Sequence, residues 1–313
     1  MSYSYWNGSL KRCKRKRNCK EIDGGAIDSM DTICYLCKGN NLSLRHKGVR
    51  DNADIDVLEC HDCGLIFLST FSHINDNFYE QSSMLGGKVD LKKYRINSLN
   101  DDNRRYHTLK DSLLNKRLLD FGCGGGGFLK LAEQVAESVR GVELDRTIRQ
   151  TLNEKDGIEV FRSVDDLSGE YDVVTLFHVL EHLPDPVAVL KHLKSHLSAK
   201  GKLIIEVPNG NDALLQLYRC SSFERFTYWS CHLILFIPET LKKVAELAGY
   251  HVQYIKQVQR YPLSNHLHWL AMNKPGGHQV WDFMNTPDLH AAYEKQLASI
   301  GMCDTLFACL YRQ

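Results

Sequence analysis

The chain has 313 residues, a length that suggests about two domains, one of them large enough for a substantial core. Its residues are 43% hydrophobic and 25% charged, as in an ordinary folded protein, and 39 Lys and Arg balance 38 Asp and Glu. The near-neutral charge argues against a chain built to bind nucleic acid or an anionic membrane, and no apolar run approaches the roughly 18 residues of a membrane span.

The first segment, residues 1–29, contains a basic run at residues 11–17. Like charges in one block repel each other, so we expect a disordered basic tail. A Cys-rich module then covers residues 30–70, and a helical linker or lid is expected over residues 71–105, with helical periodicity from Leu99 to Leu114.

The Cys-rich module contains two C-x-x-C pairs separated by 22 residues. Each pair places two thiolates on one tight turn, and two pairs at this spacing predict a closed tetrahedral shell for structural Zn²⁺, that is, a zinc ribbon. The expected ligands are Cys34, Cys37, Cys60 and Cys63. The other seven of the 11 cysteines stand singly, which argues against a disulfide framework and predicts a cytoplasmic protein.

From Arg117 onward, short β-rich runs alternate with stretches of helical periodicity. This alternation predicts βαβ units around a parallel sheet. The expected strands are 117–121, 138–143, 159–162, 171–177, 202–207, 251–259 and 305–312, and the expected helices are 127–135, 145–154, 186–196 and 238–247.

A glycine loop follows the first of these strands, and two acids accompany it. Asp120 ends the strand two residues before Gly122, and Glu143 ends the next strand. A carboxylate at the first position suits the cationic amino end of S-adenosylmethionine and has no purpose in an NAD site, while an acid at the second position would receive the ribose hydroxyls. Glycines 122, 124 and 126 let the backbone approach this cofactor closely.

Three motifs together resemble the class I S-adenosylmethionine-dependent methyltransferases: Asp120-x-Gly-x-Gly-x-Gly, Gly141-Val-Glu143 and the block from Tyr171 to Pro186. The resemblance covers roughly residues 106–260. It implies an α/β fold with a Rossmann-like seven-stranded sheet, helices on both faces and an antiparallel last strand at 305–312. Residues 261–313 would supply that strand and a cap over the acceptor.

The same resemblance assigns further cofactor contacts and a pathway. Phe177 and His178 would contact the cofactor at the end of the fourth strand, and groups around Val164 and Asp165 would meet the adenine. A ribbon ahead of such a domain resembles sugar-modifying methyltransferases of polysaccharide and deoxysugar pathways.

Histidines are expected at the methyl end of the cofactor. A helical turn after the fourth strand would place His178 and His182 on one face beside Glu181, and His232 would arrive from the opposite wall. Methyl transfer to oxygen needs a proton acceptor, and a His suits that task, so His182 and His232 are the candidate general bases. Ubiquinone-pathway and small-RNA methyltransferases have a similar block that holds a divalent ion, so a second metal on His178, Glu181, His182 and His232 is the alternative.

We therefore expect methyl transfer to a small-molecule acceptor, best matched by a nucleotide-linked or polysaccharide-pathway sugar. An RNA methyltransferase that grips its substrate through ribbon and basic tail is one alternative. A non-catalytic binding protein is another, although it would leave Asp120 and Glu143 without a purpose. Oligomeric state has no signature in the sequence.

Overall fold

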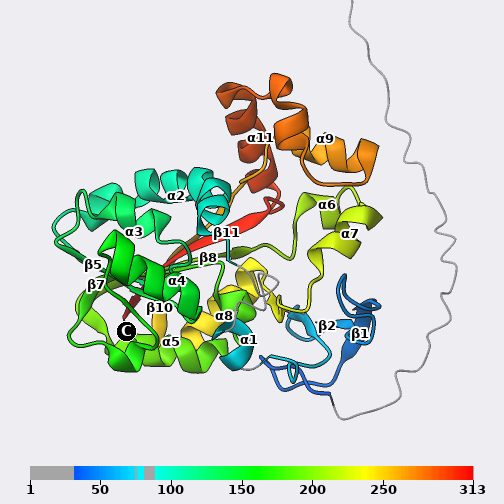
Figure 1. Ribbon diagram of the computed structural model, residues 1–313. Helices are drawn as coiled ribbons and strands as arrows, with labels where there is room; N and C mark the ends of the chain where they lie inside the picture. Colours follow the sequence, from blue (N-terminus) through cyan, green and yellow to red (C-terminus); the bar gives the residue numbers. More distant parts are fainter. Residues whose placement is uncertain (1–31, 75, 81–88, 313) are drawn as a thin grey trace, which may run out of the picture. The chain divides into compact units, whose positions relative to one another are not determined.

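A seven-stranded sheet organises most of the chain (Figure 1). The computed structural model describes residues 32–74, 76–80 and 89–312, so the basic tail expected at 1–29 lies outside the described residues. The strands, in spatial order, are β10 (Tyr250–Val258), β11 (Thr305–Arg312), β8 (Leu197–Pro208), β7 (Tyr171–Phe177), β4 (Arg117–Phe121), β5 (Ser138–Val142) and β6 (Val160–Phe161). Neighbours are parallel from β6 to β8, whereas β11 runs antiparallel to both β8 and β10. The predicted α/β fold with an antiparallel last strand is confirmed.

Helices cover both faces of this sheet because consecutive strand residues point to opposite sides. Leu118 belongs to a core formed with α2 (Leu91–Leu113), α3 (Gly127–Ala132) and α4 (Arg146–Thr151). Its neighbour Leu119 belongs to the other core, formed with α5 (Pro186–Ser195) and α8 (Pro238–Leu247). No helix among the described residues combines the length and apolar character that a membrane span requires.

Two insertions after the sheet strands form a small helical group. Helices α6 (Ala213–Gln216) and α7 (Ser221–Thr227) follow β8, and α9 (Leu263–Met272), α10 (Gly277–Val280) and α11 (Pro287–Ser299) lie between β10 and β11. Ala213 of α6 packs with Leu297 of α11, and Leu214 packs with Trp269 of α9, so segments far apart in sequence share these contacts. Short turns complete the fold: α1 (Asp76–Glu80), η2 (Leu152–Asp156), η3 (Val164–Asp166), η4 (Leu180–His182) and η5 (Asp282–Met284).

The Cys-rich module, residues 32–70 and hereafter the ribbon, forms an antiparallel sheet of β1 (Leu42–His46), β2 (Val57–Cys60) and β3 (Ile66–Leu68). A fourth strand, β9 (Ile234–Leu235), comes from the chain between α7 and α8 and pairs with β3. The apolar core of the ribbon is continuous with the core beneath α5 and α8. The described residues from Ile33 onward fall in one compact unit, in which the ribbon core joins the core of the sheet.

The region expected to be a helical linker over residues 71–105 contains the larger part of α2. This helix begins at Leu91, not at Leu99, because Asp90 caps it by accepting a hydrogen bond from the backbone N–H of Lys93 at 3.0 Å. The first two turns carry few buried side chains, so periodicity gave no sign of them. The helix lies over the glycine loop, where its side chains reach the site described below.

Candidate functional site

The glycine loop between β4 and α3 brings the backbone close to neighbouring side chains. Gly122 and Gly124 have φ values of +79° and +48°, in the left-handed region that favours glycine. A Cβ on Gly122 would lie 2.4 Å from Val179 Cγ2, and one on Gly124 would lie 2.5 Å from Tyr94 Oη. Both positions therefore require glycine for conformation and for space.

Two acids, one buried and one partly buried, flank this loop, as the sequence predicted. Asp120 is 3% exposed, its carboxylate accepts a 2.7 Å hydrogen bond from Thr175 Oγ1, and burial raises its pKa to about 7. Glu143 accepts 2.9 Å hydrogen bonds from the backbone N–H groups of Gly124 and Asp145, and burial raises its pKa. A cationic ligand beside Asp120 would favour its ionised form.

A first cavity of about 540 Å³ opens beside the loop. Six residues predicted from the sequence line it: Gly122, Gly124, Glu143, Phe177, His178 and His182. Asp120 borders a smaller adjoining cavity of about 50 Å³ that shares Gly122, Gly124 and Phe177 with the first. The structure thus brings most of the predicted cofactor residues to one place.

Three predicted cofactor residues lie elsewhere. Val164 is 6% exposed and packs in the core, and the exposed Asp165 pairs with His192 Nε2 at 3.1 Å. Ser163 and Asp166 form a capping box around this turn, and neither Val164 nor Asp165 lines the first cavity. A Cβ on Gly126 would lie 2.7 Å from Leu152 Cδ2, so this glycine permits close packing of the loop.

Sequence reasoning missed the contribution of α2 to the first cavity. The α2 residues that line it are Tyr94, Asn97, Ser98, Asp101 and Arg105. Arg105 lies 4.5 Å over the Phe177 ring, and its Nη2 bonds the fully buried Glu206 Oε1 at 2.6 Å. The sequence did contain a signal for this contribution: acidic and basic residues follow one another from Asp101 to Arg105, on a helix that must pack against the sheet.

The helical turn predicted to align His178 with His182 is wrong, because His178 has a φ of 55° and precedes η4. Its Nδ1 lies 3.2 Å from Glu181 Oε1, and its Nε2 lies 3.2 Å from Glu206 Oε1 and 3.0 Å from Arg260 Nη1. His178 is consequently held by these charged side chains at the edge of the first cavity.

Glu181, His182 and His232 form a compact cluster whose ligand atoms all lie within 4.8 Å of one another. The His182 and His232 ring centroids are 5.1 Å apart, and His182 Nδ1 donates a 2.7 Å hydrogen bond to the carbonyl of Cys231. That bond leaves the lone pair of His182 on Nε2. Glu181 Oε2 and His232 Nδ1 are buried and have no hydrogen-bond partner among the described residues.

Burial and neighbouring charges set the protonation of this cluster. Burial lowers the pKa of His182, and burial together with the nearby His182 lowers the pKa of His232 to about 3. Burial acts to raise the pKa of Glu181, but its hydrogen bond with His178 and the neighbouring imidazoles lower it to about 2. At neutral pH the cluster therefore presents two neutral imidazoles and one carboxylate, which suit proton transfer or a divalent cation.

A second cavity of about 350 Å³ is lined by Glu181 and His232 of this cluster. Its apolar wall is formed by Leu214, Leu215, Phe223, Phe226, Leu235, Trp269 and Pro275. His182 lines the first cavity, His232 and Glu181 line the second, and His178 and Arg260 line both. Among the described lining residues of the second cavity Arg260 is the only Arg or Lys, and its guanidinium is bonded to both carboxylate oxygens of Asp101.

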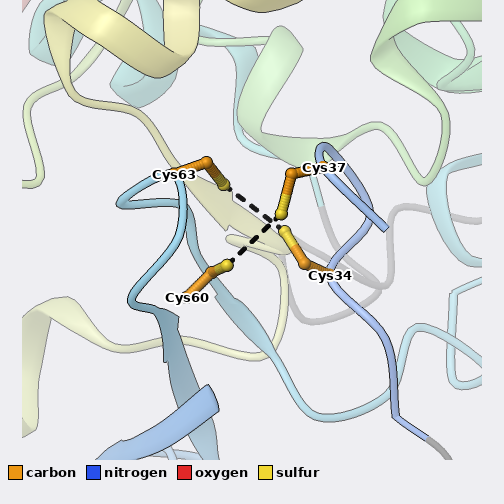
Figure 2. A group of neighbouring side chains, drawn as sticks. All are labelled: Cys34, Cys37, Cys60 and Cys63. Carbon is orange, nitrogen blue, oxygen red and sulfur yellow. Dashed lines mark hydrogen bonds between the residues drawn. The ribbon is translucent and has the colours of Figure 1, made fainter. Parts of the chain in front are cut away.

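The four predicted zinc ligands converge from two loops of the ribbon (Figure 2). Cys34 Sγ lies 3.6 Å from Cys63 Sγ, and Cys37 Sγ lies 3.5 Å from Cys60 Sγ. Four thiolates bound tetrahedrally at about 2.3 Å would lie about 3.8 Å apart, close to these distances. The cluster has the composition and spacing of a closed structural zinc site.

The family model and the sequence relatives both match this chain to methyltransferases. A family model described as "Methyltransferase domain" matches residues 93–255. The ubiquinone biosynthesis O-methyltransferase of Xanthomonas euvesicatoria is 33% identical over 133 residues, which are 39% of this chain and 55% of the relative. The enzyme of the same name from Aeromonas salmonicida is 28% identical and covers 49% of this chain and 70% of the relative. Little more than half the length of the Xanthomonas relative is therefore matched.

Among solved structures, the magnesium protoporphyrin IX methyltransferase of Synechocystis, determined with bound SAH, is similar with a TM-score of 0.48 and 16% identity. That match covers 78% of this chain and all of that one.

Proposed function

Because the chain belongs to the methyltransferase domain family, we propose that it transfers the methyl group of S-adenosylmethionine to a hydroxyl oxygen of a small, largely apolar acceptor. The observation that carries this proposal is the position of the histidine pair. His182 and His232 lie between a cavity lined by the glycine loop and a cavity with an apolar wall. A donor in the first and an acceptor in the second would meet at these imidazoles.

The methyl donor would occupy the first cavity. Gly122 and Gly124 allow its close approach, and Glu143 would receive the ribose hydroxyls. Asp120 would face the ammonium of the methionine part, and Arg105 would attract its carboxylate. Since Glu206 holds Arg105 through a 2.6 Å ion pair, the guanidinium is oriented before the cofactor binds.

His182 is the better placed proton acceptor of the two candidates. The acceptor oxygen would attack the methyl carbon in line with the breaking C–S bond, which converts the sulfonium to the neutral thioether of S-adenosylhomocysteine. The hydroxyl proton would pass to His182 Nε2, because Nδ1 is occupied by the carbonyl of Cys231. The pKa of His232, about 3, makes that imidazole a weak base, so its role would be to orient the acceptor.

The second cavity supports an uncharged acceptor with an apolar or aromatic body. Its aromatic wall suits such a ring, and its one guanidinium is already paired with Asp101. The relatives named as ubiquinone biosynthesis O-methyltransferases favour oxygen as the methylated atom and an acceptor from a quinone pathway. The nucleotide-linked or polysaccharide-pathway sugar expected from the ribbon has no such support, since a nucleotide phosphate would find no free cation among the described residues of this wall.

A divalent cation at Glu181, His182 and His232 is the second candidate for this chemistry. The orphaned Glu181 Oε2 and His232 Nδ1 fit such an ion, and His182 Nδ1 already has the backbone partner typical of a metal-bound imidazole. When bound, the ion would act as a Lewis acid that favours ionisation of the acceptor hydroxyl. In both versions the four cysteines of the ribbon would hold a structural Zn²⁺.

The test uses purified chain, S-adenosylmethionine with a labelled methyl group, and a panel of phenols, catechols, nucleotide sugars and RNA, read by mass spectrometry. We expect label in a phenol or catechol ether, and label only in a sugar or RNA would refute the acceptor class. His182→Ala should lower turnover about 10²–10⁴-fold while S-adenosylhomocysteine binding is kept. The exposed His192→Ala is the matched control. Activity unchanged by EDTA favours the metal-free base, and EDTA inhibition reversed by Mg²⁺ favours the metal-assisted version.

A further inference from the structure

The segment that delivers His232 to the site has no regular secondary structure of its own. Residues 228–233, hereafter the histidine wall, connect α7 to β9 as turn and extended chain. This wall places Trp229 in the lining of the first cavity and His232 in the lining of the second. The Trp229 and His232 ring centroids are 5.4 Å apart, and both rings also contact His182 edge-on. One backbone hydrogen bond lies within the wall, from the N–H of His232 to the carbonyl of Trp229 at 2.9 Å, and contacts from outside the wall complete its support.

The ribbon supplies a bidentate contact to the centre of the wall. Asp51 Oδ1 accepts a 3.0 Å hydrogen bond from the backbone N–H of Ser230, and Asp51 Oδ2 accepts a 2.6 Å bond from Ser230 Oγ. Ser230 lies between Trp229 and Cys231, and the carbonyl of Cys231 orients His182. The carboxylate of Asp51 thus binds Ser230, which lies between Trp229 and His232 in the chain.

Neighbouring ribbon residues hold the two ends of the wall. The backbone N–H of Arg50 donates to the carbonyl of Tyr228 at 2.9 Å, and the Arg50 guanidinium lies 4.4 Å over the Trp229 ring. At the other end, the backbone N–H of Leu68 donates to the carbonyl of Leu233 at 2.9 Å, just before β3 pairs with β9. The ribbon thus holds the wall at both ends and at Ser230.

We propose that Asp51 is a positioning residue for methyl transfer, and that the ribbon with its four-cysteine site holds in place the histidine wall, which carries His232 into the lining of the acceptor cavity. Asp51 acts through Ser230 to hold Trp229 and His232 between the two cavities. The role given to these side chains rests on the proposed function, whereas the anchoring of the wall by Asp51 does not. Loss of metal from the ribbon would then loosen the acceptor side of the site and leave the glycine loop ordered.

Hydrogen exchange read by mass spectrometry tests the anchoring in the full chain with S-adenosylhomocysteine bound. We expect Asp51→Ala to speed exchange in peptides covering residues 229–233 at least tenfold and to leave peptides of β4 and the glycine loop unchanged. Asp54→Asn is the matched control, because Asp54 is an exposed acid on the same loop. Ser230→Ala, which removes only the hydroxyl, is the milder second variant if Asp51→Ala folds poorly.

Unchanged exchange at residues 229–233 in both Asp51→Ala and Ser230→Ala would overturn the proposal, as would equal acceleration throughout the sheet. Removal of the ribbon metal should reproduce the accelerated exchange at the wall, and protection there after metal loss would overturn the second part.

A kinetic readout separates positioning from general destabilisation. With the acceptor found in the panel above, Asp51→Asn should raise the acceptor KM or lower kcat at least tenfold and change the KM for S-adenosylmethionine less than twofold. Asp51→Glu should restore part of the loss, because it keeps the charge. Equal losses for donor and acceptor would contradict a positioning role. If no acceptor is methylated, the proposed function fails, and the exchange result still decides whether Asp51 anchors the wall.

Discussion

Replacement of Gly124 by alanine tests whether close approach at the glycine loop is required for donor binding. A Cβ at this position would lie 2.5 Å from Tyr94 Oη and 3.1 Å from its Cζ, and the residue has a φ of +48°. Gly157→Ala is a matched control, because Gly157 has a φ of +68° and nothing within 4 Å of its Cβ position. Both variants carry the left-handed strain of about 1 kcal/mol. Only Gly124→Ala adds overpacking, which costs about 1–3 kcal/mol.

The expected result follows from this difference. Gly157→Ala should lower the free energy of unfolding by about 1 kcal/mol and leave the Kd for S-adenosylhomocysteine within about twofold. Gly124→Ala should lower the free energy of unfolding by about 2–4 kcal/mol. It should also weaken S-adenosylhomocysteine binding about tenfold or more, because the added Cβ hinders close approach of the ligand, and a loss of about 1.4 kcal/mol of binding free energy is a factor of ten. Urea unfolding and isothermal titration calorimetry measure the two quantities. Adding Tyr94→Phe should recover part of the loss, because it removes the nearest atom. Equal Kd values for the two alanine variants would refute the reasoning.

Three further predictions concern the metal, the buried ion pairs and pH. Elemental analysis should find about one Zn²⁺ per chain and none in Cys60→Ser; wild-type protein that is purified without zinc or another thiophilic metal and does not bind added Zn²⁺ would contradict the ribbon site. Glu206→Gln should lower the free energy of unfolding by about 3–5 kcal/mol in urea, because it removes the carboxylate that lies nearest to the buried Arg105 guanidinium and also pairs with Arg104, whereas Glu159→Gln in an exposed pair should cost less than about 1 kcal/mol. Burial lowers the pKa of His266 to about 4, so the unfolded chain binds a proton first as pH falls below about 6.5. His266→Gln should therefore reduce the pH slope of stability between pH 6 and 5 by about 1.4 kcal/mol per unit, and an unchanged slope would show that His266 is protonated in the folded chain.

The sheet was predictable because its strands are strongly patterned. Strands 117–121, 171–177 and 305–312 and helix 238–247 have the bounds that the sequence indicated. Each is a short apolar run or a periodic segment bounded by turn residues, so local pattern and burial agree. Strand β8 starts at Leu197 rather than Lys202, because its first residues pair beside β7 without an apolar alternation.

The site was predictable only where a motif lies in one stretch of sequence. Asp120, Glu143 and the four cysteines follow from spacing along the chain. Arg105 and Tyr94 reach the first cavity because α2 packs over the glycine loop, which is a long-range contact that no local pattern encodes. The pairing of β3 with β9 involves two residues of β9, too few to give a period, so the union of ribbon and sheet could not be foreseen. The helical turn expected from His178 to His182 was wrong because the left-handed backbone of His178 breaks the helical spacing on which the prediction relied.

The antiparallel strand β11 has a consequence for biosynthesis. It pairs on one side with β8 and on the other with β10, although residues 305–312 leave the ribosome long after both. Until then the facing edges of β8 and β10 have no strand between them, and unpaired edges expose backbone groups that favour aggregation. The part of the sheet from β6 to β8, which carries the glycine loop, can assemble during translation. The sheet is complete only once β11 is inserted between β8 and β10. A nascent chain stalled before residue 305 would therefore depend on chaperones to remain unaggregated.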